Sequence, residues 1–396
     1  MAEKQLKPGW KVWRFDQIAT NVNERVDNPS ESGMEHYVGL EHLDSDSLKI
    51  RRWGSPDDVE ATKLVFRKGD IIFGRRRAYQ RKLGVAEFDG ICSAHAMVLR
   101  AKPDVVLPEF LPFFMQSDVF MNRAVEISVG SLSPTINWKT MAAQKFVLPP
   151  VDDQIRILQM LRASYSVVDS YQDLISAGQR LWESRAKNLF GKGMVEQPAP
   201  LGTLLSYSSD GPFGSKLKTE HYSEEGARVI RLNNIDSLEF NDEDAAFISL
   251  DYFRELSNYE VKGGDVIIAG LGDDRIPMGR ACIVPSTIGL AINKADCYCV
   301  RPNEKLSARY LVHFLNSSVG LSQARSMAQG TTRTRLNLSN IKRIAVPVLS
   351  LGEQDEIADE LDSYLLAKRE AVLRLNASLL VRDQMRESAF VGADYV

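Results

Sequence analysis

The sequence lacks most of the patterns that carry catalysis or covalent cross-linking. Its four cysteines form no C-x-x-C pair, and its five histidines fall at no spacing typical of metal ligands. This argues against a disulfide scaffold or a zinc cluster and predicts free thiols in a reducing compartment. No run of about 18 apolar residues is present, and the N-terminal sequence lacks a signal peptide's apolar core. We therefore expect a cytoplasmic protein with no membrane partner.

Catalytic sequence motifs are missing as well. There is no Walker A loop, no G-x-S-x-G, no H-E-x-x-H and no G-x-G-x-x-G after a strand. The run at 148–151 lacks both the amide or acid and the aromatic residue of an amino-methyltransferase motif. Ser93 and His95 could share one face of a strand as nucleophile and base, but a hydrogen-bonded pair is the simpler interpretation.

Two long stretches contain almost no helix-breaking residues. Residues 152–190 contain no proline and a single glycine, Gly178, and residues 353–389 contain neither. Apolar residues recur every seven positions along both stretches, which predicts two long helices with one apolar seam each. At 1.5 Å per residue, the first helix would be about 57 Å long.

The apolar seams favour pairing of the two helices, because a lone heptad seam would leave apolar surface in water. The alternative is two independent surface helices, each packed on its own domain. Polar residues such as Gln172, Gln179 and Lys368 interrupt the seams, which suggests more surface than the pair can satisfy alone. The seam residues are Leu158, Leu161, Tyr165, Val168, Ile175, Trp182, Leu361, Leu365, Val372, Leu375 and Leu379.

The chain repeats itself at a spacing near 200 residues. GDII at 69–72 recurs as GDVI at 264–267, and Gln154 recurs as Gln354. This period is too long for a solenoid and indicates two copies of a globular domain plus a long helix. Strand-like and helical runs mix within each copy, so we predict an α+β (mixed) fold. The predicted boundaries are 1–151 and 194–352 for the globular domains, 152–193 for the central helix and 353–396 for the C-terminal helix.

Positive charge is concentrated in one loop of the first copy. Residues 67–82 read RKGDIIFGRRRAYQRK, with seven basic residues and one acid. A basic, aromatic-containing loop after a strand fits phosphate contact and guanine recognition by arginine. The alternative is a solvated charged loop, but the lack of compensating acids favours DNA contact. The residues expected to contact DNA are Arg75, Arg76, Arg77, Tyr79, Arg81 and Lys82.

The second copy has a different loop in the same place. Residues 270–280 hold Asp274, Arg275 and Arg280, and these acid and arginine types can read cytosine and guanine. The alternative is that the acids merely neutralise the arginines. Different loop chemistry on one framework is what two domains that read different sequences would need. Further candidate DNA contacts are Lys216, Arg333, Arg335, and the hydroxyls of Ser131 and Ser133.

Taken in order, these features resemble the specificity (S, HsdS) subunits of Type I restriction-modification systems. DGPFGSKL at 210–217, followed by RVIRLNNI at 228–235, is similar to the opening of a target recognition domain of that family. The two GD strands are similar to a strand of that family, and the resemblance covers nearly the whole chain. The first copy lacks the GPFG run and has Asp153 where the family has glutamate. The two domains should therefore be of different subtypes and recognise unlike half-sites.

The resemblance implies two tandem target recognition domains, each followed by a long conserved helix, with the helices paired as an antiparallel coiled coil. Each domain would read one half of an asymmetric bipartite site in double-stranded DNA, and the helices would set the gap. The seam residues would also dock two modification subunits, which bind S-adenosylmethionine and methylate adenine N6. Two restriction subunits, driven by ATP and Mg²⁺, can join the complex in bacterial defence against phage. This chain itself would bind no cofactor or metal and would catalyse no reaction.

Two other classes of function stay open on the sequence. One is an enzyme with its own nuclease or methyltransferase site, against which the missing motifs argue. The other is a coiled-coil adaptor that binds protein and no nucleic acid, against which the basic loop at 75–82 argues.

Overall fold

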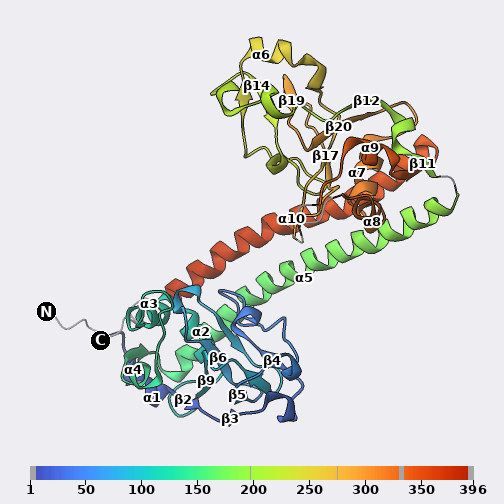
Figure 1. Ribbon diagram of the computed structural model, residues 1–396. Coiled ribbons are helices and arrows are strands. Elements are labelled where there is room, and N and C mark those ends of the chain that lie inside the picture. Colours follow the sequence, from blue (N-terminus) through green and yellow to red (C-terminus); the bar gives the residue numbers. More distant parts are fainter. Residues whose placement is uncertain (1–5, 197, 274, 330–333, 391–396) are drawn as a thin grey trace. The chain divides into compact units, whose positions relative to one another are not determined.

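The computed structural model describes residues 6–196, 198–273, 275–329 and 334–390. The chain divides into two compact units, one made of residues 1–171 and 373–396 and the other of residues 172–372. Each unit contains one globular domain together with part of each long helix, α5 (Val151–Glu196) and α10 (Leu351–Ala389) (Figure 1). The mixed fold and the long helix after each domain are confirmed.

The first unit is built around two four-stranded sheets. Their strand orders are β2-β9-β6-β7 and β3-β5-β8-β4, and β1 pairs with β10 in a separate ribbon. All pairs are antiparallel except β4 with β8. The elements are β1 (Lys11–Arg14), α1 (Phe15–Ile18), β2 (Ala19–Val22), β3 (Arg25–Val26), β4 (Tyr37–Val38), β5 (Lys63–Phe66), β6 (Ile71–Gly74), β7 (Leu83–Val85), β8 (Gly90–Cys92), β9 (Ala96–Ala101), α2 (Leu111–Gln116), α3 (Asp118–Glu126), α4 (Trp138–Ala142) and β10 (Lys145–Leu148).

The second unit repeats this arrangement with one further strand. Its sheets have the orders β12-β20-β17-β18 and β13-β15-β14-β19-β16, and β11 pairs with β21. The elements are β11 (Pro198–Pro200), β12 (Leu205–Ser209), β13 (Tyr222–Ser223), β14 (Ala227–Ile230), β15 (Phe247–Ile248), α6 (Leu250–Glu255), β16 (Glu260–Val261), β17 (Val266–Ala269), β18 (Ala281–Ile283), β19 (Ala291–Asn293), β20 (Cys297–Pro302), α7 (Ala308–Asn316), α8 (Ser318–Ser326), α9 (Leu338–Arg343) and β21 (Ala345–Pro347).

The repeated Gly-Asp pair has the same structural role in both units. Asp70 is buried and accepts from the Arg100 Nε at 2.7 Å and from its Nη2 at 2.9 Å. Asp265 is also buried, and Arg301 donates to it at 2.6 and 2.8 Å. Each buried carboxylate directly precedes a strand, and its negative charge is stabilised by the paired arginine. The repeat in the sequence therefore reflects a shared ion pair that ties β6 to β9 and β17 to β20.

A buried glutamine joins each globular domain to the helix that follows it. The Gln154 side chain accepts from the Leu107 backbone N–H at 2.9 Å and donates to the carbonyls of Val105 and Pro149. Gln354 makes the same three contacts in the second unit, with Ser307, Lys305 and Leu349. Both side chains are fully buried, so each closes the hydrogen bonds of a turn that water cannot reach.

Replacing Gln154 with leucine should destabilise the first unit strongly. The leucine fills a similar volume but leaves one backbone donor and two carbonyls without partners, at a cost of about 2–4 kcal/mol. Thermal or urea unfolding of the full chain measures this loss. Gln159→Leu changes an exposed glutamine on the same helix, so it should alter stability by less than about 0.5 kcal/mol. Equal stability of the two variants would contradict the assigned role.

The two long helices run antiparallel within the second unit. Arg185 of α5 forms an ion pair with Glu360 of α10 at 2.5 Å, and Gln179 accepts from Lys368 at 2.7 Å. Contacts therefore advance along one helix as they recede along the other. In the first unit, the Arg382 guanidinium of α10 lies over the Tyr165 ring of α5 at 5.2 Å. These contacts match the antiparallel pairing that we expected.

The seam residues join the helices to the globular cores as well as to each other. Leu158, Leu161 and Tyr165 lie in the core of the first unit, and Trp182 and Leu361 lie in that of the second. Among the other seam residues, Val168 is buried, and Ile175, Leu365, Leu375 and Leu379 are half-buried.

The burial pattern of the seam changes at Val372, which is 37% exposed while the adjacent Ala371 is buried. A straight helix has 3.6 residues per turn, so a strict seven-residue frame drifts around its surface over several heptads. The buried stripe has moved by one position at this point of α10.

A buried histidine connects α7 to both long helices in the second unit. The Trp182 Nε1 donates to the His313 Nδ1 at 3.3 Å, and the His313 Nε2 lies 3.0 Å from an Asp362 oxygen. Burial lowers the pKa of His313, although Asp362 opposes that change. The neutral ring suits this geometry, because Nδ1 must accept from tryptophan while Nε2 donates to the carboxylate.

We expect the second unit to lose stability as the pH falls below about 6.5, the ordinary histidine pKa. Because the folded pKa is lowered, the unfolded chain binds the proton more readily, so acid favours unfolding. Unfolding of wild type and His313→Gln at pH 7.5 and 5.5 measures the effect. The variant should lose less stability on acidification than wild type does. An unchanged pH dependence would assign the loss to other groups.

Candidate nucleic-acid interface

The basic loop of the first unit packs against a second loop that is distant in sequence. The strand β6 ends at Gly74, and the Arg75 carbonyl accepts from the Ile136 N–H at 3.0 Å. The Arg77 N–H donates to the Pro134 carbonyl at 2.7 Å, and Arg76 forms a β-bridge with Thr135. Backbone pairing thus places the arginine run and the hydroxyl-rich loop at 129–136 side by side.

Three neighbouring arginines carry the positive charge of this site. The Arg76 and Arg77 guanidinium groups donate to the Ser133 hydroxyl at 3.1 and 3.3 Å, and Arg75 donates to the Ala94 carbonyl at 3.0 Å. Throughout the described residues, no carboxylate lies within ion-pair distance of these three side chains. Their charge is left for an anion, as a phosphate-binding or guanine-reading surface requires.

His95 joins this cluster, a position that the sequence pattern of Ser93 and His95 did not indicate. Its Nε2 lies 3.5 Å from the Arg76 Nη1, and its backbone N–H donates to the Ser93 hydroxyl at 3.2 Å. The second contact is a local turn, so the interpretation as a structural pair is confirmed. Burial lowers the pKa of His95, and the charges of Arg76 and Arg75 lower it further. A neutral imidazole can accept or donate at a base edge.

A hollow of about 390 Å³ adjoins the arginine cluster. His95, Ser93 and Asp58 line it together with Tyr37 and Lys63. These residues come from three segments far apart in the sequence, so no local pattern could have predicted the hollow. Its hydroxyl, imidazole and carboxylate groups can all form hydrogen bonds with base edges.

Two of the basic residues predicted to contact DNA also have partners inside the protein. Arg81 forms ion pairs with Asp46 at 2.7 Å and Asp118 at 2.9 Å, and the Lys82 Nζ donates to the Leu40 carbonyl at 2.7 Å. The compensating acids come from outside the run at 67–82, which is why the sequence appeared to lack them. Tyr79 and Ser131 are exposed beside the cluster and stay candidates for contact.

The equivalent loops of the second unit pack in the same way. The Leu336 N–H donates to the Gly270 carbonyl at 2.9 Å, as Ile136 does to Arg75. Arg335 forms an ion pair with Asp296 at 2.5 Å, and its guanidinium lies over the Phe213 ring at 5.2 Å. The predicted contacts Asp274 and Arg333 lie outside the described residues. The second loop pair thus offers an arginine already matched by a carboxylate, in contrast to the first.

The assignment of Arg280 to DNA contact is wrong. Its side chain is buried, and it donates to the backbone carbonyls of four residues, which are Leu232, Ile235, Leu271 and Pro277. A guanidinium used in this way holds loops together, because four of its five N–H donors are bonded to backbone carbonyls. Arg275 is exposed, and Lys216 is an exposed cation that donates to the Tyr259 hydroxyl at 3.2 Å.

The described residues contain no group of three or more histidine, cysteine, aspartate or glutamate side chains that could hold a metal ion. The four cysteines are free and buried. Among the helices of the described ranges, none is long and apolar enough to cross a membrane.

Comparison with known proteins identifies relatives along most of the chain. The sequence profile of the Type I restriction modification DNA specificity domain matches residues 10–175 and 214–374. The Type I restriction enzyme EcoDI specificity subunit of Escherichia coli is 25% identical over 169 residues, 42% of this chain and 37% of that protein. The MjaVIII specificity subunit of Methanocaldococcus jannaschii is 21% identical over 255 residues, 59% of this chain and 58% of that protein. Each match spans less than two thirds of the relative's length.

Solved structures share the fold over nearly the whole chain. A chain from a study of complex assembly and conformational transition of the type I R-M system aligns over 98% of both chains, with a TM-score of 0.59 and 19% identity. The S subunit of a Type-I restriction-modification system from M. genitalium aligns over 98% of this chain and 97% of its own, with a TM-score of 0.56 and 14% identity. At 19% and 14% identity, these structures show that the chain shares their fold.

Proposed function

Because the chain belongs to the family of Type I restriction modification DNA specificity domains, we propose that it is the DNA-recognition subunit of a Type I restriction-modification complex. Each globular domain reads one half of an asymmetric bipartite site in double-stranded DNA. The chain supplies sequence recognition and assembly, and its partners supply the chemistry. Adenine methylation with S-adenosylmethionine belongs to two modification subunits, and ATP- and Mg²⁺-dependent cleavage belongs to restriction subunits where they are present.

The observation that carries this proposal is the arginine cluster of Arg75, Arg76 and Arg77. These three cations have hydroxyl, carbonyl and imidazole neighbours but no carboxylate within the described part of the chain. Backbone amide and hydroxyl groups of the loop at 129–136 lie beside them and add further phosphate donors. A solvated charged loop would instead spread its arginines into water or pair them with acids, as Arg81 is paired.

The difference between the two loop pairs supports unlike half-sites. The first unit presents unpaired arginines and a neutral histidine, whereas the second presents Arg335 paired with Asp296. A carboxylate favours base amino groups, and an unpaired arginine favours guanine or phosphate. The long helices α5 and α10 serve as the spacer that keeps the half-sites roughly one duplex turn apart, about 34–36 Å.

Exposed apolar residues on each long helix are proposed as separate docking surfaces for the modification subunits. Leu373 and Leu380 of α10 are 65% and 68% exposed and lie seven residues apart, on one face of the helix. Leu174 and Leu181 of α5 have the same spacing and are both 52% exposed. Most of the seam residues that the sequence predicts for docking are buried by the chain's own packing.

Salt titration of DNA binding by the purified chain tests the proposal. Binding to a random-sequence duplex should weaken steeply with salt, and the slope should fall by about 2–3 when the three arginines of the cluster become alanine. The chain alone should neither cut nor methylate that duplex in the presence of Mg²⁺ and S-adenosylmethionine. Salt-independent or absent binding would favour a protein-only adaptor, and turnover by the chain alone would favour an enzyme.

A further inference from the structure

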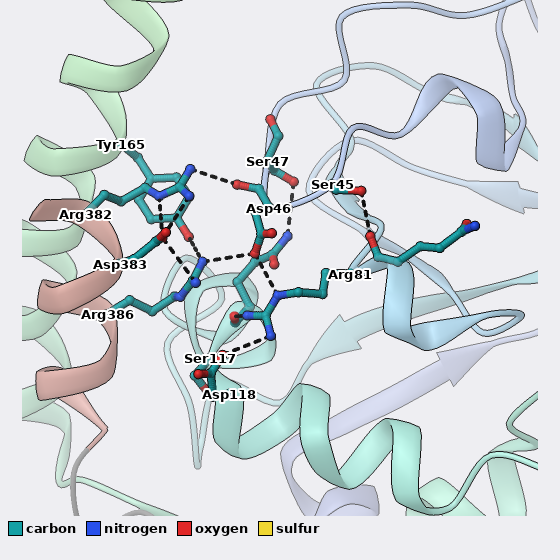
Figure 2. A network of polar contacts seen from close by, with 12 residues as sticks. Ser45, Asp46, Ser47, Arg81, Ser117, Asp118, Tyr165, Arg382, Asp383 and Arg386 are labelled. Atoms are coloured by element: carbon teal, nitrogen blue, oxygen red, sulfur yellow. Dashed lines mark hydrogen bonds and ion pairs between the residues drawn. The ribbon is translucent and has the colours of Figure 1, made fainter. Parts of the chain in front are cut away.

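Asp46 of the first unit contacts arginines from two distant parts of the chain (Figure 2). Its carboxylate accepts from the Arg81 Nε at 2.7 Å and from the Arg386 Nη1 at 3.2 Å. Its backbone carbonyl accepts from the Arg382 Nη1 at 3.1 Å. Arg81 lies near the end of the basic loop, whereas Arg382 and Arg386 belong to the last turns of α10. Asp46 is therefore a polar link between the proposed reading loop and the C-terminal helix.

The helix side of this link needs the aspartate for its own charge balance. Arg382 and Arg386 are both 5% exposed, and Tyr165 lies against Arg382. Asp383 contacts both guanidinium groups, at 2.8 and 3.2 Å, but it can neutralise only one of them. Buried charges are stable only when they are paired. Asp118 pairs with Arg81, so three aspartates balance the three arginines of the network. Of these aspartates, Asp46 is the one that contacts both the basic loop and α10.

The loop side of the link holds a backbone that would not persist on its own. Arg77 and Arg81 take the left-handed conformation, with φ of 57° and 52°, at the two ends of the short helix Ala78–Gln80. Such φ values are unfavourable for residues with a side chain and must be imposed by the surroundings. The Asp46–Arg81 ion pair and the bond from the Ser45 hydroxyl to the Gln80 carbonyl, at 2.7 Å, fix the far end of this segment. Its near end carries Arg76 and Arg77.

The second unit has no equivalent of the helix arginines. Moved by 200 positions, Arg382 and Arg386 correspond to Trp182 and Ala186, which are buried in an apolar cluster. The coupling of helix to loop through charge is thus a property of the first recognition domain.

We propose that Asp46 is a positioning residue for the first half-site. It holds the arginine loop in its reading conformation by tying it to the end of α10, so base selection by the first domain depends on the C-terminal helix. This inference rests on the proposed function, and it adds that one half of the site is read only when the Asp46–Arg386 contact is intact.

Selection of bound duplexes from a library with randomised sequence tests the inference. The full-length chain is compared with Asp46→Asn, which keeps the shape and removes the charge, and with Arg386→Met. Both should lose about tenfold in base discrimination over one contiguous block of positions, the same block that Arg76→Ala affects. Discrimination in the other block should be unchanged. Arg386→Lys restores the charge and should recover part of the loss.

A control separates positioning from general destabilisation. Arg369 is also on α10, where it forms an exposed ion pair with Glu239, so Arg369→Met should leave both blocks intact. Thermal melting identifies any variant that fails to fold. If Asp46→Asn fails to fold, the difference in base discrimination between Arg386→Lys and Arg386→Met tests the inference. If Asp46→Asn and Arg386→Met keep wild-type discrimination in both blocks, or lose it equally in both, the role of Asp46 is wrong. The proposed function of the chain would still stand in either case. If the wild-type chain selects no sequence, the proposed function fails with it.

Discussion

Replacing Arg76 and Arg77 with alanine is expected to remove recognition of one half-site while leaving the fold intact. Both guanidinium groups converge on the Ser133 hydroxyl and have no carboxylate partner within the described ranges. Each arginine–guanine or arginine–phosphate contact contributes about 1–3 kcal/mol, so the double variant should bind its specific duplex about a hundredfold more weakly. Binding is measured with the preferred duplex at fixed salt. Thermal stability should not change, because neither side chain lies in the core.

Arg156→Ala is the matched control for this variant. Arg156 is on α5, its side chain is 78% exposed, and its contact is with Asp153 one helical turn away. Its loss should change neither DNA affinity nor stability by a measurable amount. Wild-type discrimination at both half-sites by the double variant would show that the arginine cluster is a solvated loop. Loss at both half-sites would show that it contributes charge only.

Replacing Leu373 and Leu380 with aspartate should abolish binding of the modification subunit without unfolding the chain. Both leucines are largely exposed on one face of α10, so charged residues there cost the isolated chain little. Against a partner, two buried and unpaired carboxylates would cost several kcal/mol. Copurification of a co-expressed modification subunit measures the loss. DNA binding by the isolated variant should stay unchanged.

Leu361→Asp provides the contrast on the same helix. Leu361 is fully buried in the core of the second unit, so a charge there should destabilise that unit by about 4 kcal/mol or more. Comparison of the two variants separates docking from packing. If the variant with aspartate at positions 373 and 380 still binds the modification subunit, that subunit docks on another face of the chain.

The sequence predicted the framework well because its signals are local. The heptad pattern and the absence of proline determine where long helices can form. The Gly-Asp pairs repeat because Asp70 and Asp265 each bind an arginine on the neighbouring strand. Gln154 and Gln354 repeat because each closes the same turn. Such residues are recognisable as a pattern even where their partners cannot be seen in the sequence.

The fate of individual arginines could not be predicted in the same way. Arg280 and Arg275 have the same side chain in one loop, yet Arg280 is buried against carbonyl groups up to 48 residues away. Arg81 and Arg386 each donate to Asp46, through tertiary contacts that span 35 and 340 residues. Whether a cation faces solvent or the interior depends on these distant partners, so charge density alone could indicate the loop but not its contacting members.

Methylation mapping in cells tests the central claim most directly. The chain is expressed with the modification subunit of its own system in a host without adenine methylation, and genomic N6-methyladenine is mapped against cells lacking the chain. We expect methylation at a split motif with two unlike halves and a fixed gap, and the Arg76→Ala, Arg77→Ala double variant should relax one half only. An identical methylation pattern with and without the chain would contradict its role as the DNA-recognition subunit.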